Sequence, residues 1–396
     1  MRICLVYDHL FPQTVGGMER WLRDLAVGLA REHDVTYLTM RHWDPLAPPI
    51  VPGVRVLGLV DAGKIYSEDR RRLGPPVWFG LAVARHLARH GGDYDVVHLA
   101  SFPYFPVLAA GAMRRHGGYE IVVDWPEVWT RSYWRHYAGW FAGTLGWLVQ
   151  RACLRVPHRA HGMSRLHADR LVTEGYRGTP VVLPGLYSGP TNLLQRDDVD
   201  ESLIVYAGRH VREKRVGALI RAFAVARRAR PHLRLELYGD GPQQREIEGI
   251  VRTLGLEEHV LMAGRRPEDE VSRALARAGC LATASEREGY GLVVVEAAAH
   301  GTPSVVVAGP ENAATELVAQ GINGAVSPSA DPEDLAVAML GVLDGGAELR
   351  SSTARWFEDN AGRLRLDRSL QLVLDEYEGT TVTRSPSLER ESRRTA

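Results

Sequence analysis

The chain has 396 residues, of which 45% are hydrophobic and 24% charged, with 48 basic and 48 acidic side chains. This composition is that of an ordinary globular protein, and the length favours two domains, each large enough to bury its own core. The three cysteines, Cys4, Cys153 and Cys280, lie far apart. So sparse a set excludes a disulfide framework and a zinc site, and we expect buried free thiols in a reducing compartment.

The N-terminus carries no recognisable targeting signal. Residues 1–7 form a short apolar run that ends at Asp8 without a cleavage pattern of small residues, so we expect no signal peptide. No stretch reaches about 18 uninterrupted apolar residues, which predicts that the chain has no transmembrane helix. We therefore expect a cytoplasmic protein.

Charge is unevenly distributed along the chain. Through Leu183 there are 22 basic and 16 acidic residues, a net of +6, and the remaining 26 basic and 32 acidic residues give −6. The excess in the first half points weakly to an anionic partner or surface. The chain has 46 arginines but only two lysines, Lys64 and Lys214, so a lysine is unusual in this sequence.

The first half alternates strand and helix patterns, which implies a parallel sheet covered on both faces. In chain order, the pattern predicts a strand over 2–7, a helix over 19–30, strands over 34–40 and 54–60, a helix over 77–89, a strand over 95–99, a helix over 106–115, a strand over 121–124, a helix over 139–154 and a strand over 181–184.

After a stretch rich in Gly, Pro, Ser and Asn, the alternation restarts. The pattern predicts strands over 203–207, 233–238, 260–262, 281–284 and 304–307, and helices over 216–229, 243–254, 267–278, 292–299, 313–319 and 332–343. We predict an N-terminal domain over 1–184, a linker over 185–200, a second domain over 201–346, C-terminal helices over 347–378 that cross back to the N-terminal domain, and a disordered tail over 379–396. Ligands bind at the carboxyl ends of the strands in such sheets.

The strongest local signal is the segment SEREGYGLVVVEAAAHGTP at 285–303. A strand is followed by a glycine-flanked loop and a helix, and free N–H groups at a helix start favour a phosphate group. Seven residues separate Glu288 from Glu296. Eight residues of helix span about 12 Å, which matches the reach from a ribose across a diphosphate to a sugar. The alternative is a capped amphipathic helix with two solvated glutamates.

Two further segments follow predicted strands. In GRHVREK, at 208–214, Arg209 and Lys214 stand at the carboxyl end of a strand, where two cations can neutralise a diphosphate. A solvated basic loop is the alternative. In TVGGMER, at 14–20, Gly16 and Gly17 let the backbone approach a ligand, although a plain tight turn explains them as well.

These segments resemble retaining glycosyltransferases of the large family 4. The matching pieces are the Gly-Gly turn, GRHVREK, YGDGP and above all EREGYGLVVVEAAAHGTP. The resemblance covers nearly the whole chain to about Glu376 and is densest over 206–328. It implies an α/β protein with the GT-B fold, in which two Rossmann-like domains with parallel sheets face a central cleft. The domain over 1–184 would then be the acceptor side, and the domain over 201–346 would bind the nucleotide sugar.

The resemblance also implies roles for individual residues. It places Glu288 at the donor sugar, Glu296 at the ribose, Arg209 and Lys214 on the diphosphate, Gly208, Tyr290, Gly291 and Leu292 along the donor through their backbone, Arg265 near the base, and Gly16 and Gly17 opposite them on the other domain. The family needs no metal and no cofactor besides the nucleotide-sugar donor. The sequence Asp93-Tyr94-Asp95 spells D-x-D, and we interpret it as a solvated turn.

The implied reaction moves a hexose-type sugar from a nucleotide diphosphate donor to a hydroxyl acceptor with retention of the anomeric configuration. Domain closure would align the reacting groups and exclude water. The donor could carry UDP, GDP or dTDP, and no nucleic-acid partner is predicted. A sugar-nucleotide epimerase or hydrolase, or a non-catalytic sugar-nucleotide-binding subunit, would share the same fold. A Rossmann dehydrogenase is disfavoured because no G-x-G-x-x-G follows the first strand.

The sequence departs from the family at two points. Relatives often carry His where this chain has Pro126, within DWPEVW at 124–129, which leaves Asp124 and Glu127 as candidates for the sugar contact. His98 is a further candidate, with a structural role in the core as its alternative. Arg215 stands where relatives often have Gly after the lysine, which makes the loop bulkier and more basic.

The segment 125–147 is rich in aromatic residues. It holds Trp125, Trp129, Tyr133, Trp134, Tyr137, Trp140, Phe141 and Trp147, with Arg131 and Arg135 between them. Amphipathic aromatic side chains suit an apolar or lipid-linked acceptor, or peripheral contact with the inner face of a membrane. Packing of a loop and helix in the core explains them equally well.

Overall fold

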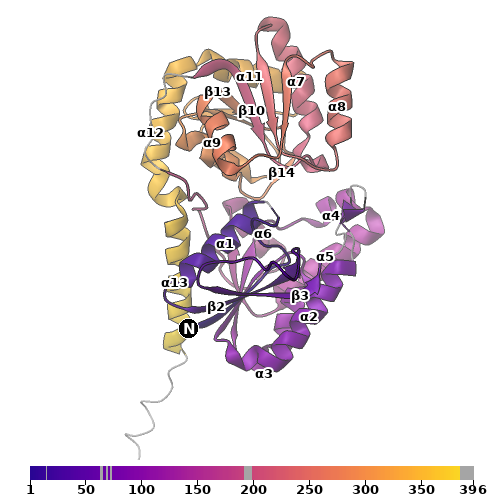
Figure 1. Cartoon of the computed structure of the whole chain (residues 1–396), viewed down its shortest axis with the longest axis vertical. Coiled ribbons are helices and arrows are strands. Elements are labelled where there is room, and N and C mark those ends of the chain that lie inside the picture. The colour runs from indigo at the N-terminus through magenta and orange to yellow at the C-terminus, as the bar shows by residue number, and fades with distance from the viewer. Residues whose placement is uncertain (15, 63–65, 68–69, 72–73, 191–198, 384–396) are drawn as a thin grey trace, which may run out of the picture.

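The computed structural model describes residues 1–14, 16–62, 66–67, 70–71, 74–190 and 199–383, which build two α/β domains, one above the other in Figure 1. The strands of the N-terminal sheet are ordered β3-β2-β1-β6-β7-β8-β9, and every pair is parallel. Their bounds are β1 Arg2–Val6, β2 Asp34–Arg41, β3 Val54–Asp61, β6 Val96–Ala100, β7 Glu120–Trp125, β8 Arg159–Gly162 and β9 Val181–Val182. A short antiparallel pair, β4 Tyr66–Ser67 and β5 Arg70–Arg71, stands apart from this sheet.

Both faces of the N-terminal sheet are buried. Successive residues of a strand point to opposite faces: Cys4 and Val6 of β1 join one hydrophobic core, and Ile3 and Leu5 join another. This is why β1 reads as a continuous apolar run. The helices of this domain are α1 Gly17–Leu29, α2 Gly74–His90, α3 Phe105–Gly117, α4 Arg131–Ala138, α5 Trp140–Arg155 and α6 Arg165–Thr173, with a 3₁₀ turn η1 at Gly91–Asp93.

The C-terminal domain repeats this architecture. Its strand order is β12-β11-β10-β13-β15-β17, again with parallel pairs. The strands are β10 Asp200–Ala207, β11 Arg234–Tyr238, β12 Val260–Gly264, β13 Ala278–Ala282, β15 Ser304–Val307 and β17 Gly324–Ser327, and the short strands β14 Arg287–Glu288 and β16 Glu311–Asn312 pair with each other. The helices are α7 Val216–Ala229, α8 Gln244–Thr253, α9 Glu268–Arg277, α10 Leu292–Ala299 and α11 Pro332–Asp344, with 3₁₀ turns η2 Arg212–Lys214 and η3 Ala313–Leu317.

Two long C-terminal helices, α12 Gly346–Leu364 and α13 Leu366–Thr383, run along one side of both domains (Figure 1). At their junction, the Tyr187 N–H donates to the Leu364 carbonyl at 3.1 Å, and the Leu366 N–H donates to the Tyr187 carbonyl at 2.9 Å. The two crossings of the chain between the domains are therefore joined side by side. Half of the predicted linker, residues 191–198, lies outside the described residues.

The predicted fold class, two α/β domains with parallel sheets, is confirmed. The sequence patterns missed α4, α6, β8 and β17, which are short, and the predicted helix over 313–319 is a 3₁₀ turn. The predicted disordered tail begins too early: α13 continues to Thr383, since an established helix extends at little cost. Residues 384–396 lie outside the described residues. Among the described helices, none combines the length and apolar character needed to cross a bilayer.

Candidate active site between the two domains

The predicted phosphate loop follows β10 directly. Gly208 donates its N–H to the carbonyl of Tyr238 at 2.9 Å, and a Cβ on Gly239 would lie 1.9 Å from the Gly208 carbonyl oxygen. The loops after β10 and β11 therefore meet backbone to backbone, which fixes the start of the loop. Arg209 is exposed just beyond this contact, and Lys214 ends the turn η2.

Lys214 and Glu288 come together across 74 residues of sequence. The Lys214 ammonium donates to a carboxylate oxygen of Glu288, and the two side chains are 19% and 22% exposed. One lies after β10 and the other after β13, which are neighbours in the sheet. The carboxyl ends of parallel strands meet at one edge, so the sheet itself assembles this pair.

The start of α10 carries the glycine that the sequence singled out. Gly291 has φ +101°, a left-handed conformation, and a Cβ there would lie 2.7 Å from the Cβ of Ala314. Any other residue would be strained by the left-handed backbone and would collide with Ala314, so the position requires glycine. The hydroxyl of the preceding Tyr290 donates to the Pro184 carbonyl at 2.6 Å, which anchors the turn to the end of the N-terminal domain. Leu292 opens α10, and N–H groups in the first turn of a helix lack the preceding carbonyls that later ones use. The Val294 N–H instead donates to the Gly291 carbonyl at 2.9 Å.

Glu296, farther along α10, faces the other domain. Nη1 of Arg20, on α1, donates to its Oε1 at 2.7 Å, and the same Nη1 lies 3.4 Å from Oε1 of Glu268. Glu296 is 22% exposed, and burial raises its pKa. In the sequence, Arg20 is only the last residue of TVGGMER, and no pattern there predicts a contact with Glu296. The structure shows this contact.

The other residues predicted to contact the donor, Gly16, Gly17 and Arg265, lie along the same interface. Gly16 caps α1, and a Cβ on Gly17 would meet no atom within 4 Å, so this first turn, which also carries Arg20, has open space beside it. Arg265 is exposed just after β12, and its Nη2 lies 3.4 Å from the Pro12 carbonyl of the N-terminal domain.

Asp124 lies in a fully buried polar cluster. Its carboxylate accepts from Trp21 Nε1 at 2.6 Å and lies 2.8 Å from both His161 Nδ1 and His98 Nε2. Burial alone would raise the pKa of Asp124, but the charges and hydrogen bonds of His98 and His161 outweigh it and hold the pKa well below its usual range. The acceptor capacity of this carboxylate is thus committed to the protein.

The same cluster holds α13 against the N-terminal domain. His161 Nε2 lies 3.0 Å from a Glu376 carboxylate oxygen, and His98 Nδ1 lies 2.6 Å from the Tyr377 hydroxyl. Burial would lower the pKa of His161, but its bonds to Asp124 and Glu376 raise it to about 9. The structure thus buries His98 and Asp124, two candidates for the sugar contact, in a cluster that holds α13 against the N-terminal domain.

These groups also have the proximity of a metal site. The ligand atoms of His98, Asp124 and His161 lie within 4.8 Å of one another. Both His161 nitrogens face carboxylates, those of Asp124 and Glu376, and His98 Nδ1 faces the Tyr377 hydroxyl, so these atoms already have protein partners. The donor set therefore fits a charge network better than a metal ion.

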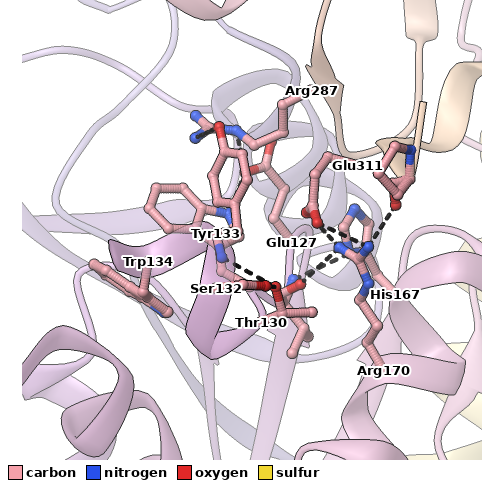
Figure 2. A network of polar contacts seen from close by, with 12 residues as sticks. Glu127, Thr130, Ser132, Tyr133, Trp134, His167, Arg170, Arg287 and Glu311 are labelled. Carbon is pink, nitrogen blue, oxygen red and sulfur yellow. Dashed lines mark hydrogen bonds and ion pairs between the residues drawn. The ribbon is translucent and has the colours of Figure 1, made fainter. Parts of the chain in front are cut away.

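Glu127, unlike Asp124, lies at the domain interface (Figure 2). Its carboxylate accepts from Trp129 Nε1 at 2.8 Å and pairs with Arg287 Nε at 2.9 Å. Next to it, a Cβ on Gly289 would lie 2.5 Å from the Pro126 carbonyl oxygen. The backbone at Pro126 is therefore in close contact with the loop between β14 and α10.

The aromatic segment divides into two groups. Trp125, Trp129 and Trp134 are buried, at 0%, 8% and 8% exposure, as the core interpretation predicts. Trp140 and Phe141, at the start of α5, are 69% and 77% exposed, which core packing does not explain.

Comparison with protein families gives two matches that together span most of the chain. Residues 16–185 match the glycosyl transferase 4-like domain, and residues 195–356 match glycosyl transferases group 1. The chain is a family 4-type glycosyltransferase. Its two parallel-sheet domains are those of the GT-B fold, as the resemblance implied.

Individual relatives agree with this assignment. The glycosyltransferase is 27% identical over 370 residues to a GDP-mannose-dependent α-(1-6)-phosphatidylinositol monomannoside mannosyltransferase of Mycolicibacterium smegmatis, covering 86% of this chain and 88% of that one. It is 33% identical to an exopolysaccharide phosphotransferase of Streptomyces coelicolor, but over 41% of this chain and only 17% of that longer protein. The crystal structure of Anabaena Alr3699/HepE in complex with UDP and glucose superposes with a TM-score of 0.74 at 17% identity, covering 96% of this chain and 99% of that one.

Proposed function

We propose that this glycosyltransferase moves a hexose-type sugar from a nucleotide diphosphate donor to a hydroxyl acceptor, with retention of configuration and without a metal ion. The observation that carries the proposal is the arrangement around α10. A cation–carboxylate pair, Lys214 and Glu288, stands beside the start of the helix, and Glu296 lies about one turn into it. That order matches a sugar, a diphosphate and a ribose.

The diphosphate binds where positive charge is concentrated. Arg209 and Lys214 supply two cations, and the first N–H groups of α10 supply oriented donors. Together they stabilise the charge that develops on the leaving group, which is the task a divalent metal performs in other transferases. This supports a metal-independent reaction.

In the proposed step, the bond between the anomeric carbon and the β-phosphate oxygen breaks. The acceptor hydroxyl oxygen bonds to the same carbon on the same face, and its proton passes to the departing diphosphate oxygen. Glu288 holds the sugar hydroxyls and Glu296 the ribose hydroxyls. No side-chain base is required, so positioning by the closed cleft and charge stabilisation carry the catalysis.

Two donors are the first to test. The M. smegmatis relative is named for GDP-mannose, and the Anabaena structure holds UDP and glucose. We propose titration calorimetry of UDP-glucose, GDP-mannose and a dTDP-sugar with the wild-type chain, with Lys214→Ala, with Glu296→Ala and with Arg273→Ala as a control. Arg273 is 58% exposed and pairs with Asp269 on the surface of α9.

We expect one nucleotide to bind selectively, both site variants to weaken it at least tenfold, and the control to match wild type. Equal binding by all four proteins would contradict the assignment of the site. Product analysis with the selected donor separates transfer from the alternatives: an epimerised or hydrolysed donor in the presence of acceptors, or no turnover at all, would contradict transferase activity.

For the acceptor, the outer face of α5 supports an apolar or lipid-linked molecule and peripheral contact with a membrane. Trp140, Phe141, Leu145 and Leu148 are between 52% and 77% exposed. Residues 128–168 contain six arginines and no Asp or Glu. Exposed aromatic and aliphatic side chains beside arginines suit an anionic bilayer surface. With three buried free cysteines, we place the enzyme at the cytoplasmic face.

Vesicle co-sedimentation tests the membrane contact. We expect binding to phosphatidylglycerol-rich vesicles that falls with added salt and is weakened at least fivefold by Trp140→Ser with Phe141→Ser. Leu261→Ser is the control, because Leu261 is 54% exposed but lies on β12 of the other domain. Equal sedimentation of the double variant and wild type would contradict the proposed surface.

A further inference from the structure

Two adjacent residues of the donor loop point in opposite directions. Arg287 and Glu288 form the short strand β14, and successive side chains of a strand alternate between its two sides. Glu288 turns to Lys214 in its own domain, whereas Arg287 crosses the interface into the N-terminal domain (Figure 2). One extended dipeptide thus joins the donor site to the opposite domain.

The guanidinium of Arg287 enters an aromatic box made by Trp129, Tyr133 and Tyr137. Its central carbon lies 4.3 Å from the Trp129 ring centre, 5.5 Å from that of Tyr133 and 5.6 Å from that of Tyr137. Cation–π contacts at these distances are attractive, and more so when water is excluded. The Arg287 side chain is only 15% exposed.

Polar partners complete the box. Arg287 Nε pairs with Glu127 at 2.9 Å, Nη1 donates to the Tyr133 hydroxyl at 3.0 Å, and Nη2 lies 3.4 Å from Glu213 of its own domain. Burial alone would lower the pKa of Arg287, but Glu127, Tyr133 and Glu213 raise it, so the side chain stays charged. A buried charge with this many partners holds a defined geometry, and removing one partner strongly destabilises the arrangement.

The box is connected to the phosphate loop by more than one bond. Glu213, which touches Arg287, precedes Lys214, which touches Glu288. The backbone N–H of Glu286 donates to the Glu213 carbonyl at 2.8 Å. The two loops therefore form one unit, and a displacement of Arg287 is transmitted to the Lys214–Glu288 pair.

From this geometry we propose that Arg287 is a positioning residue that couples closure of the two domains to the placement of Glu288. When the domains close, the box captures the guanidinium and sets the loop on which Glu288 stands. When they part, the loop loses its anchor. The effect on sugar binding rests on the function proposed above for Glu288, whereas the effect on domain closure does not.

Distance measurements test the first half of the coupling without any substrate. Spin labels attached to Ala88→Cys on α2 and Val337→Cys on α11 would report the separation of the domains, since both positions are exposed. The native cysteines are buried and burial raises the pKa of each thiol, so labelling is selective. We expect Arg287→Ala to shift the distribution to longer and broader distances. Arg273→Ala should leave it unchanged.

Nucleotide binding tests the second half. UDP or GDP meets Lys214 but lacks the sugar that Glu288 is proposed to hold, so Arg287→Ala should weaken its binding only a few-fold. The extra affinity of the matching nucleotide sugar over the bare diphosphate should fall at least tenfold. Arg287→Lys keeps the charge but cannot form the planar fork, so it should fall between wild type and Arg287→Ala.

Tyr133→Phe removes only the hydroxyl that accepts from Arg287 and guards against a folding defect in the arginine variants. A smaller shift in the same direction would support the proposal. An unchanged distance distribution in Arg287→Ala would overturn it, as would a changed distribution with an intact sugar contribution. If wild type binds no nucleotide, the proposed function fails, but the distance measurement still decides the role of Arg287 in closure.

Discussion

The two domains use their carboxylates differently. Glu288 and Glu296, in the C-terminal domain, are each 22% exposed and each pair with a cation, Lys214 and Arg20 respectively. Asp124, in the N-terminal domain, is fully buried and has Trp21, His98 and His161 as partners. All three are acidic residues beside a strand end or helix start, yet only the first two keep oxygen atoms that a ligand hydroxyl can reach.

This difference shows that exposure and partner number separate a binding carboxylate from a supporting one. A carboxylate whose acceptor sites are filled by protein donors stabilises the fold, and its loss should show in the free energy of unfolding. A carboxylate with remaining acceptor capacity should show its loss in kinetics or binding. Variants of both kinds of carboxylate test this division.

The largest expected effect is on stability, at Asp124. Asp124→Asn should lower the free energy of unfolding by about 3–5 kcal/mol, because it leaves the buried, protonated His161 without its main counter-charge. Chemical denaturation measures this. Asp93→Asn is the control, since the Asp93 side chain is 68% exposed, and should change stability by less than about 0.5 kcal/mol. A loss below about 1 kcal/mol for Asp124→Asn would contradict its supporting role.

The second effect is on turnover, at Glu288. Glu288→Gln should lower kcat by roughly 10²–10³-fold, as expected for a group that acts on the reacting sugar, with thermal stability close to wild type. Steady-state kinetics with the donor selected by calorimetry measures this. The affinity for the bare nucleoside diphosphate should stay within twofold. A destabilised protein with normal kcat would assign Glu288 to the supporting class instead.

The third effect is a pH dependence of stability. The pKa of His161 is raised from 6.5 to about 9, so its contribution is complete below about pH 6.5 and is lost as pH rises through 9. Stability should fall by up to about 1.4 kcal/mol per pH unit across this window. His161→Gln should flatten that slope, while His116→Gln, exposed on α3, should not. Parallel slopes in all three proteins would exclude His161 as the group responsible.

The stability contributed by the two carboxylates of this cluster depends on pH in the opposite direction. The pKa values of Asp124 and Glu376 are lowered, so their contribution is present at neutral pH and is lost as pH falls through the depressed values.

The smallest effect concerns the attachment of α13. Tyr377→Phe removes one buried hydroxyl bonded to His98 and should reduce stability by about 1–2 kcal/mol. Hydrogen exchange should speed up in α13 first. Tyr119→Phe removes a hydroxyl bonded to the Ala110 carbonyl within the N-terminal domain, so it should leave α13 protected. Equal protection of α13 in both variants would show that the Tyr377 hydroxyl does not hold this helix.

The sequence predicted best what is local. A buried strand, a glycine loop and a helix start are consecutive in the chain, so the order of Glu288, Gly291 and Glu296 around the helix start follows from the sequence alone. Lys214 could be placed because it follows a strand whose end must lie at the same sheet edge. The order of strands and helices followed from apolar periodicity, and the errors fell on short elements such as β8.

What the sequence could not predict is contact between distant segments. Arg20 meets Glu296 across 276 residues, and no periodicity carries that information. His161 lies on the short strand β8, whose sequence is RAHG. The strand has no run of aliphatic residues to predict it, because its buried side chain is a histidine paired with Asp124. Arg287 looks like one more loop arginine between two glutamates, and only the folded aromatic box distinguishes it from the other arginines.

A crystal structure of the chain with the nucleoside diphosphate that calorimetry selects would test the central claim most directly. We predict a phosphate within about 3 Å of Lys214 Nζ and of the first N–H groups of α10, with ribose hydroxyls at the Glu296 carboxylate. A diphosphate bound elsewhere, with Lys214 still paired to Glu288 and Glu296 still paired to Arg20, would contradict it.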